Sequence, residues 1–373
     1  MLDFKSKLKM LNSEIKARIS YCVIFPLISV FFAGCNGPTL IKYSLKTPAT
    51  VLHPLGQAPV SDGRVRFREI LCDLNKDHGS SFPDARSCDS ILLRLDDEPL
   101  SKPLEAQKTV LRDNLNEPTT IVFVPGIFGE CVENIVTPFA DSYAHLQSLG
   151  YIVKTISISG RSSSEVNAPI IKDALYSINA NKIIIVAYSK GVPDVLEMFR
   201  MFPDTIRQVT ALVSIAGVVS GTPIADGFLN GYEKVLSKIP AQKCPPGDGS
   251  GIRSITRQVR MKALAENKLP KSIDLYSLVS FASPDRISAP LLFSYKILSK
   301  VDPRNDGQVI FHDAVLPGST LLGYVNADHW AVALPFNRSN EPWRSLINHN
   351  DFPREIVIES VMNFINENQQ LKQ

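Results

Sequence analysis

The chain has 373 residues, of which 44% are hydrophobic and 21% are charged, so it can bury a large core. Residues 1–34 hold five of the 40 basic residues and two of the 37 acidic ones, which leaves 35 of each sign in the rest. This balance, without a basic run interleaved with aromatics, argues against a nucleic-acid partner.

The amino-terminal segment 1–34 has the order of an export signal. Basic residues come first, and the apolar run YCVIFPLISVFFAG follows and stops at Cys35. This run is short for a membrane span. The alternative is an anchor helix that stays attached, and Pro26 disfavours an unbroken helix there.

The end of that segment resembles the lipobox of bacterial lipoproteins, with Phe32 at the place where leucine is usual. The resemblance implies cleavage before Cys35, a lipid on that cysteine, and an exported protein that is anchored to a membrane at the periplasmic face or the cell surface. Asn36, where inner-membrane lipoproteins carry aspartate, favours the outer membrane.

Residues 35–62 are expected to form a tether, and residues 63–373 a single domain. The patterns RVRFREILCDL and SILLRL at its start alternate in hydropathy and predict short strands. From residue 119 onward, apolar strand patterns alternate with helical ones. The strands are expected at 119–124, 151–159, 181–189, 209–217, 275–283 and 319–325, and the helices at 138–150, 163–178, 191–202, 289–301 and 353–368.

Strands that are apolar on both faces are typical of parallel sheets covered by helices. The expected fold class is therefore α/β, with a doubly wound, mostly parallel sheet. Two helical patterns joined by CPPGDGSG interrupt the alternation at about 222–274. This insertion is interpreted as a helical lid.

Six cysteines are present, and Cys22 leaves with the export signal while Cys35 would carry the lipid. Disulfides are permitted in an exported chain. The short spacing favours a Cys72–Cys88 pair, with Cys131–Cys244 as its complement, and four reduced, buried cysteines are the alternative. Because no CxxC or His/Cys spacing suggests zinc, no metal site is expected.

The segment AYSKG, residues 187–191, lies at a predicted strand-to-helix turn. Small residues two before and two after Ser189 match the G-x-S-x-G nucleophile elbow, with Ala187 in place of the first glycine. The N–H groups at the start of the following helix favour a developing oxyanion. The expected oxyanion donors are the backbone N–H groups of Lys190 and Ile127, the latter in the loop after the strand at 119–124.

A serine nucleophile needs a histidine base and an acid, in the chain order Ser, Asp, His for this fold. His329, just after the last strand, is the expected base, and Asp306, in the turn RNDG, is the expected acid. The alternatives are His312 or His349 as the base, and Asp285 or Asp328 as the acid.

The consecutive motifs VPGIFGE, VAYSKG, IAGVVSGTPIAD, RNDGQV and NADHWAVALP resemble those of the α/β-hydrolase superfamily, and of its bacterial lipases in particular. The resemblance implies acyl transfer to Ser189, an oxyanion held by backbone N–H groups, and hydrolysis by water that His329 activates. It departs at Pro125, where such lipases usually carry histidine, and at Val218–Val219, where a Pro-His pair is common.

The expected function is carboxylic ester hydrolysis of the lipase or esterase kind, on a small-molecule or lipid ester and without a cofactor. Calcium, which some of these lipases bind, is not carried over. The alternatives are a thioesterase, amidase or acyltransferase on the same fold, because a triad does not select the leaving group or the acceptor. A surface lipoprotein that only binds a ligand is a further alternative.

Overall fold

The computed structural model of the chain describes residues 42–47, 50–100, 119–127, 135–234, 247–340 and 342–372. The expected export signal, Cys35 and the expected Cys131–Cys244 pair lie outside these residues. Leu40–Gln373 form one compact unit. None of the helices among the described residues combines the length and the apolar character needed to span a bilayer.

A mostly parallel sheet forms the centre of this unit. Within the described residues it has eight strands: seven follow the order β1-β8-β7-β6-β5-β3-β4, and β2 pairs antiparallel with β8. The other pairings are parallel, which confirms the predicted fold class. The strands are β1 (Ser61–Asp62), β2 (Leu92–Leu93), β3 (Thr120–Val124), β4 (Ile152–Thr155), β5 (Ile183–Tyr188), β6 (Val209–Ile215), β7 (Asp274–Ser280) and β8 (Thr320–Val325).

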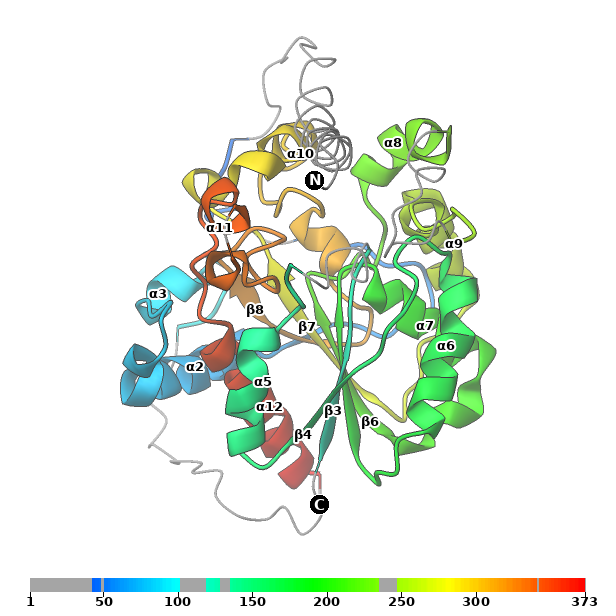
Figure 1. The fold of residues 1–373 in the computed structure, drawn as a ribbon, viewed down its shortest axis with the longest axis horizontal. Coiled ribbons are helices and arrows are strands. Elements are labelled where there is room, and N and C mark those ends of the chain that lie inside the picture. Colours follow the sequence, from blue (N-terminus) through cyan, green and yellow to red (C-terminus); the bar gives the residue numbers. More distant parts are fainter. Residues whose placement is uncertain are drawn as a thin grey trace, which may run out of the picture. The chain divides into compact units, whose positions relative to one another are not determined.

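Helices cover both faces of the sheet (Figure 1). The helices are α2 (Arg64–His78), α3 (Cys88–Ile91), α5 (Ala140–Ser148), α6 (Ser164–Tyr176), α7 (Gly191–Met201), α8 (Pro223–Lys234), α9 (Arg257–Glu266), α10 (Leu292–Leu298), α11 (Trp343–Leu346) and α12 (Arg354–Gln370). Side chains of α2, α5 and α12 share one core cluster with the strands, and side chains of α6, α7 and α9 share another on the opposite face.

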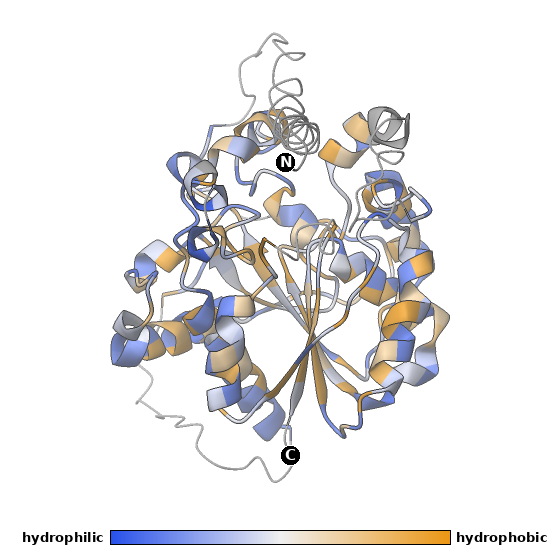
Figure 2. Ribbon diagram, viewed as in Figure 1, coloured by the Kyte–Doolittle hydropathy of each residue, from blue (hydrophilic) through white to orange (hydrophobic). Residues whose placement is uncertain are grey.

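The sequence of β5 explains why the sheet lies between two helical layers. All six of its residues are buried. Ile184 and Val186 pack in the first core cluster, whereas Ile183 and Ile185 pack in the second, because successive side chains point to opposite faces of a strand. The apolar colouring of the strands in Figure 2 follows from this double burial.

The segment RVRFREILCDL is helical, not extended, so the predicted strand there is wrong. It forms the first part of α2, in which Phe67, Ile70 and Leu71 are buried and Leu74 packs against the same core. These positions recur at helical spacing, whereas the alternation at the start of the segment is confined to its first few residues. The segment SILLRL contributes only the two-residue strand β2 after the short helix α3.

The amino-terminal part of the unit contains a disulfide and a short strand that pairs with β8. Cys72 in α2 and Cys88 in α3 form a disulfide, as their spacing predicts. The chain joins the domain before the boundary expected at residue 62, because Ser61–Asp62 pairs with β8, and Tyr43 and Val60 pack against a buried cluster.

The order of the strands predicts where a ligand-binding site lies, at the carboxyl ends of the parallel strands. The chain runs from β3 outward to β4, then returns to β5 on the other side of β3. In open α/β sheets, ligands bind beside the carboxyl ends of the strands at such a reversal. The segments that leave β3 and β5 there carry Ile127 and Ser189.

Candidate active site

Ser189 occupies the sharp turn between β5 and α7. Its φ is 55°, in the left-handed region that a non-glycine residue rarely adopts. The turn is held by backbone hydrogen bonds: the Ser189 N–H donates to Ile215 O, and the Ser189 carbonyl accepts from the N–H groups of Val192 and Val218, all at 3.2 Å. Strain that is secured by its surroundings in this way is typical of a nucleophile elbow.

Small residues around this turn are required by close backbone approach. A Cβ on Gly191 would lie 2.5 Å from Pro125 O and 2.6 Å from Val124 O, so the strand β3 leaves no room for one. A Cβ on Gly126 would lie 2.8 Å from the Ser189 Cβ. Ala187, at the departing position of the motif, is fully buried inside β5, where its methyl group is accommodated.

Ser189, His329 and Asp306 lie in hydrogen-bonding contact, although the last two are more than 100 residues away from the first in the sequence. Ser189 Oγ is 2.8 Å from His329 Nε2, and His329 Nδ1 is 2.7 Å from Asp306 Oδ2. The exposed fractions of the three residues are 4%, 5% and 0%. A carboxylate on Nδ1 favours the tautomer in which Nε2 is free to accept the serine proton.

The carboxylate of Asp306 is fixed by its own turn. Its Oδ1 accepts hydrogen bonds from the N–H groups of Gln308 at 2.8 Å and Val309 at 2.7 Å, which leaves Oδ2 for the imidazole. Gly307 has a φ of 90°, a conformation that glycine adopts without steric cost. The Asp306 carbonyl accepts from the His329 N–H at 2.8 Å, so the acid and histidine segments are joined twice.

Tyr188 holds the histidine loop, a role that sequence reasoning missed. Its hydroxyl donates to the His329 carbonyl at 2.6 Å, and its ring lies 5.1 Å from the imidazole. Burial, with smaller contributions from Asp306 and Asp328, raises the pKa of Tyr188 well above its ordinary value, so the phenol stays a donor. The signal available in the sequence was an aromatic residue directly before Ser189.

The rival residues lie elsewhere or make other contacts. Asp285 is exposed, and His349 is an exposed residue with a φ of 57°. His312 Nε2 lies 3.8 Å from Oδ1 of the neighbouring Asp313. Asp328 is buried, which raises its pKa, and its two oxygens accept the N–H groups of Ser288, Trp330 and Ala331.

The two expected oxyanion donors follow the carboxyl ends of two neighbouring parallel strands, β5 and β3. Lys190 directly precedes α7, and Ile127 follows β3. Among the described residues, no backbone hydrogen bond from the N–H group of Lys190 or of Ile127 is found.

The side chain of Lys190 points into the protein, which the sequence analysis did not anticipate. Its Nζ lies 2.8 Å from both oxygens of Asp194, and both side chains have 0% exposure. Ser164 Oγ and Asn167 Nδ2 complete the carboxylate's hydrogen bonds. The signal was a lysine and an aspartate four residues apart at the start of a helix, where such a pair is usually taken for a surface ion pair.

Solved structures of an esterase and of a lipase are similar to this chain. A metagenomic carboxyl esterase of known structure is 38% identical, with a TM-score of 0.77 and a match that covers 87% of this chain and 97% of the esterase. A Bacillus licheniformis lipase in its mature form is 21% identical over 58% of this chain and 89% of its own, with a TM-score of 0.47. No family model and no curated protein sequence matches the chain.

The likeness to the metagenomic carboxyl esterase gives no support to the thioesterase, amidase, acyltransferase or binding-module alternatives. The identity to the metagenomic esterase extends over nearly the whole length of that protein. The chain therefore belongs to the carboxyl esterases of the α/β-hydrolase fold, and it is a carboxylic ester hydrolase.

Proposed function

We propose that the chain hydrolyses esters through an acyl-enzyme on Ser189, with His329 as the general base and Asp306 as the acid that orients it. The observation that carries the proposal is the continuous series of short contacts from Ser189 Oγ, through both imidazole nitrogens, to a fully buried carboxylate. A strained turn that exposes the hydroxyl to an imidazole is costly to maintain for packing alone.

In the proposed reaction, Ser189 Oγ attacks the ester carbonyl carbon while His329 Nε2 takes the hydroxyl proton. The imidazolium that forms is stabilised by Asp306 through Nδ1–H. When the tetrahedral intermediate collapses, the C–O bond to the alcohol breaks and His329 returns the proton to the leaving oxygen. Water, deprotonated by His329 Nε2, then attacks the acyl carbon of the acyl-enzyme. The bond between that carbon and Ser189 Oγ breaks, the imidazolium returns the proton to Oγ, and the carboxylic acid leaves.

The negative charge of the intermediate would be held by the N–H groups of Ile127 and Lys190. This role is supported by their position beside Ser189 and by the absence, among the described residues, of a backbone hydrogen bond from either N–H group. The loss of one such donor lowers kcat by about 10²- to 10³-fold in related chemistry.

Residues 222–274 are proposed to form a lid over an acyl-bearing substrate, such as a small-molecule or lipid ester. The segment begins beside the turn that carries Asp306, because Thr222 Oγ1 donates to Gln308 O at 2.5 Å. Its helices α8 and α9 interrupt the alternation of strand and helix between β6 and β7.

A fluorophosphonate tests the proposal, because it phosphonylates only a serine that is activated by a base. We expect one adduct per chain, on the peptide that contains Ser189, and none in Ser189→Ala. Ser177→Ala, which removes an exposed serine at the end of α6, is the matched control and should label like the native chain. An adduct on any other serine in the native protein would refute the assignment.

The same reagent reports on the lid when its alkyl chain is varied. If residues 222–274 cover the site, labelling by a long-chain reagent should accelerate once the reagent forms micelles, whereas labelling by a short-chain one should not. Identical concentration profiles for the two reagents would contradict the lid while leaving the assignment of the nucleophile intact.

We further propose that the protein is exported and anchored to the outer membrane through a lipid on Cys35. The proposal is supported by the basic and then apolar order of residues 1–34 and by the lipobox-like ending. Radiolabelled fatty acid should be incorporated by the native chain and not by Cys35→Ala. Equal incorporation by both chains would exclude this cysteine as the anchor.

A further inference from the structure

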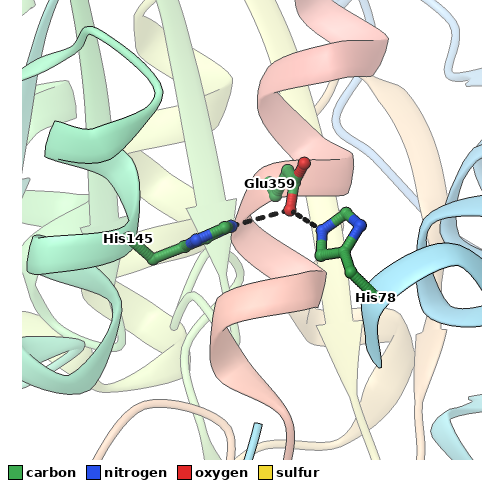
Figure 3. A group of neighbouring side chains, drawn as sticks. All are labelled: His78, His145 and Glu359. Atoms are coloured by element: carbon green, nitrogen blue, oxygen red, sulfur yellow. Dashed lines mark hydrogen bonds and ion pairs between the residues drawn. The ribbon is translucent and has the colours of Figure 1, made fainter. Parts of the chain in front are cut away.

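Two histidines and a glutamate meet on the helical face formed by α2, α5 and α12, and none of them takes part in the proposed ester chemistry. His78 is the last residue of α2, His145 lies in α5, and Glu359 lies in α12. Figure 3 shows the two imidazoles pointing at the carboxylate from either side. No metal site was expected, because no CxxC or His/Cys spacing in the sequence suggests zinc. These three residues come from three separate helices and form no short motif.

The distances converge on one carboxylate oxygen. Glu359 Oε2 lies 2.8 Å from His78 Nε2 and 2.7 Å from His145 Nε2. The candidate ligand atoms of the three residues all lie within 4.8 Å of one another. From these contacts we propose that His78, His145 and Glu359 form a binding site for a zinc-type divalent metal ion.

The donor set fits that ion. Two imidazole nitrogens and one carboxylate oxygen are a common set of zinc ligands, with a fourth position left to water. Tetrahedral zinc holds its ligand atoms roughly 3.3 Å apart, so each imidazole nitrogen would withdraw from the carboxylate oxygen by about half an ångström. The two nitrogens would then coordinate the metal through their lone pairs instead of donating to one oxygen, and the protons on Nε2 would pass to Nδ1 or to solvent.

The surroundings allow both access and the required charge. The exposed fraction of the side chain is 34% for His78, 16% for His145 and 7% for Glu359, so the cluster opens to solvent at His78. The carboxyl group of Glu359 supplies the anionic ligand of the set. Phe82 packs edge-on against both imidazoles and limits their rotation.

A metal ion here would tie together helices that are distant in the sequence. His145 and Glu359 are separated by 214 residues, and His78 and Glu359 by 281. A ligand that binds only the folded state stabilises it according to its concentration relative to Kd. The inferred role is therefore a clamp on one helical layer, independent of the ester chemistry.

Calorimetric titration of the untagged, chelator-treated mature chain with Zn²⁺ alone tests the proposal. We expect one ion per chain, and a rise in Tm on the order of 5 °C at a hundredfold excess of free zinc over Kd. Glu359→Gln and His145→Gln should each weaken zinc binding at least tenfold. His349→Asn is the matched control: it removes an exposed histidine at a backbone conformation that asparagine tolerates, and it should leave binding unchanged.

His78→Gln keeps the test decisive if the more buried variants fold poorly, because His78 is the most exposed of the three residues. It should bind zinc at least tenfold more weakly and should abolish the zinc-dependent rise in Tm. No stoichiometric binding by the native chain, or binding that His78→Gln leaves intact, would overturn the proposal. In that case the cluster is a hydrogen-bonded ion pair only.

Discussion

Replacing Ser189 with alanine is expected to lower kcat for a nitrophenyl ester by roughly a millionfold, since the proposed mechanism then lacks its nucleophile. His329→Ala should cost about as much, and Asp306→Asn about 10⁴-fold, because an asparagine in that place stabilises the wrong imidazole tautomer. The Ser189→Ala/His329→Ala double variant should be no slower than either single variant, since the residues act as a unit.

Matched controls for this series come from the rival residues. Asp285→Asn and His312→Gln remove an acid and a base that lie away from Ser189, and each should retain nearly full activity. Circular dichroism and Tm report whether each variant is folded. If Asp285→Asn lost as much activity as Asp306→Asn, the contact between Asp306 and His329 would not be the catalytic one.

The order of motifs made the central part of the site predictable. In β5, four apolar residues from Ile183 to Val186 are followed by small and polar residues, and this change of character marks the end of a buried strand. The helix α7 begins at Gly191, where the carbonyl oxygens of Val124 and Pro125 approach too closely for any side chain. Such local steric requirements are visible in a sequence. The chain order of the fold led to the expectation that Asp306 and His329 lie near Ser189, and the three residues are in hydrogen-bonding contact.

Features that depend on distant partners were not predictable. The first residues of α2 alternate in hydropathy, and the helical spacing that begins at Phe67 is decisive only once its packing in the core is known. Tyr188 acquires its role only because the loop that carries His329 returns to it. The convergence of His78, His145 and Glu359 likewise requires the packing of three helices, which no window of sequence contains.

Removal of the Asp194 carboxylate is expected to lower the free energy of unfolding strongly. In Asp194→Ala, the ammonium group of Lys190 stays fully buried and loses the carboxylate to which it is hydrogen-bonded, a change that costs about 3–5 kcal/mol of unfolding free energy. The hydroxyl of Ser164 and the amide of Asn167 also lose their acceptor. Equilibrium denaturation by urea measures this loss.

The exposed pair Lys262–Glu266 in α9 is the matched control, because it has the same spacing of four residues while its side chains are 72% and 60% exposed. Glu266→Ala should change the unfolding free energy by no measurable amount. Replacing both buried partners, as Lys190→Met with Asp194→Leu, should cost less than Asp194→Ala alone, since the ammonium group is removed together with its carboxylate. If the double replacement were as destabilising as the single one, the loss would arise from packing around α7 and not from the ammonium group that has lost its carboxylate.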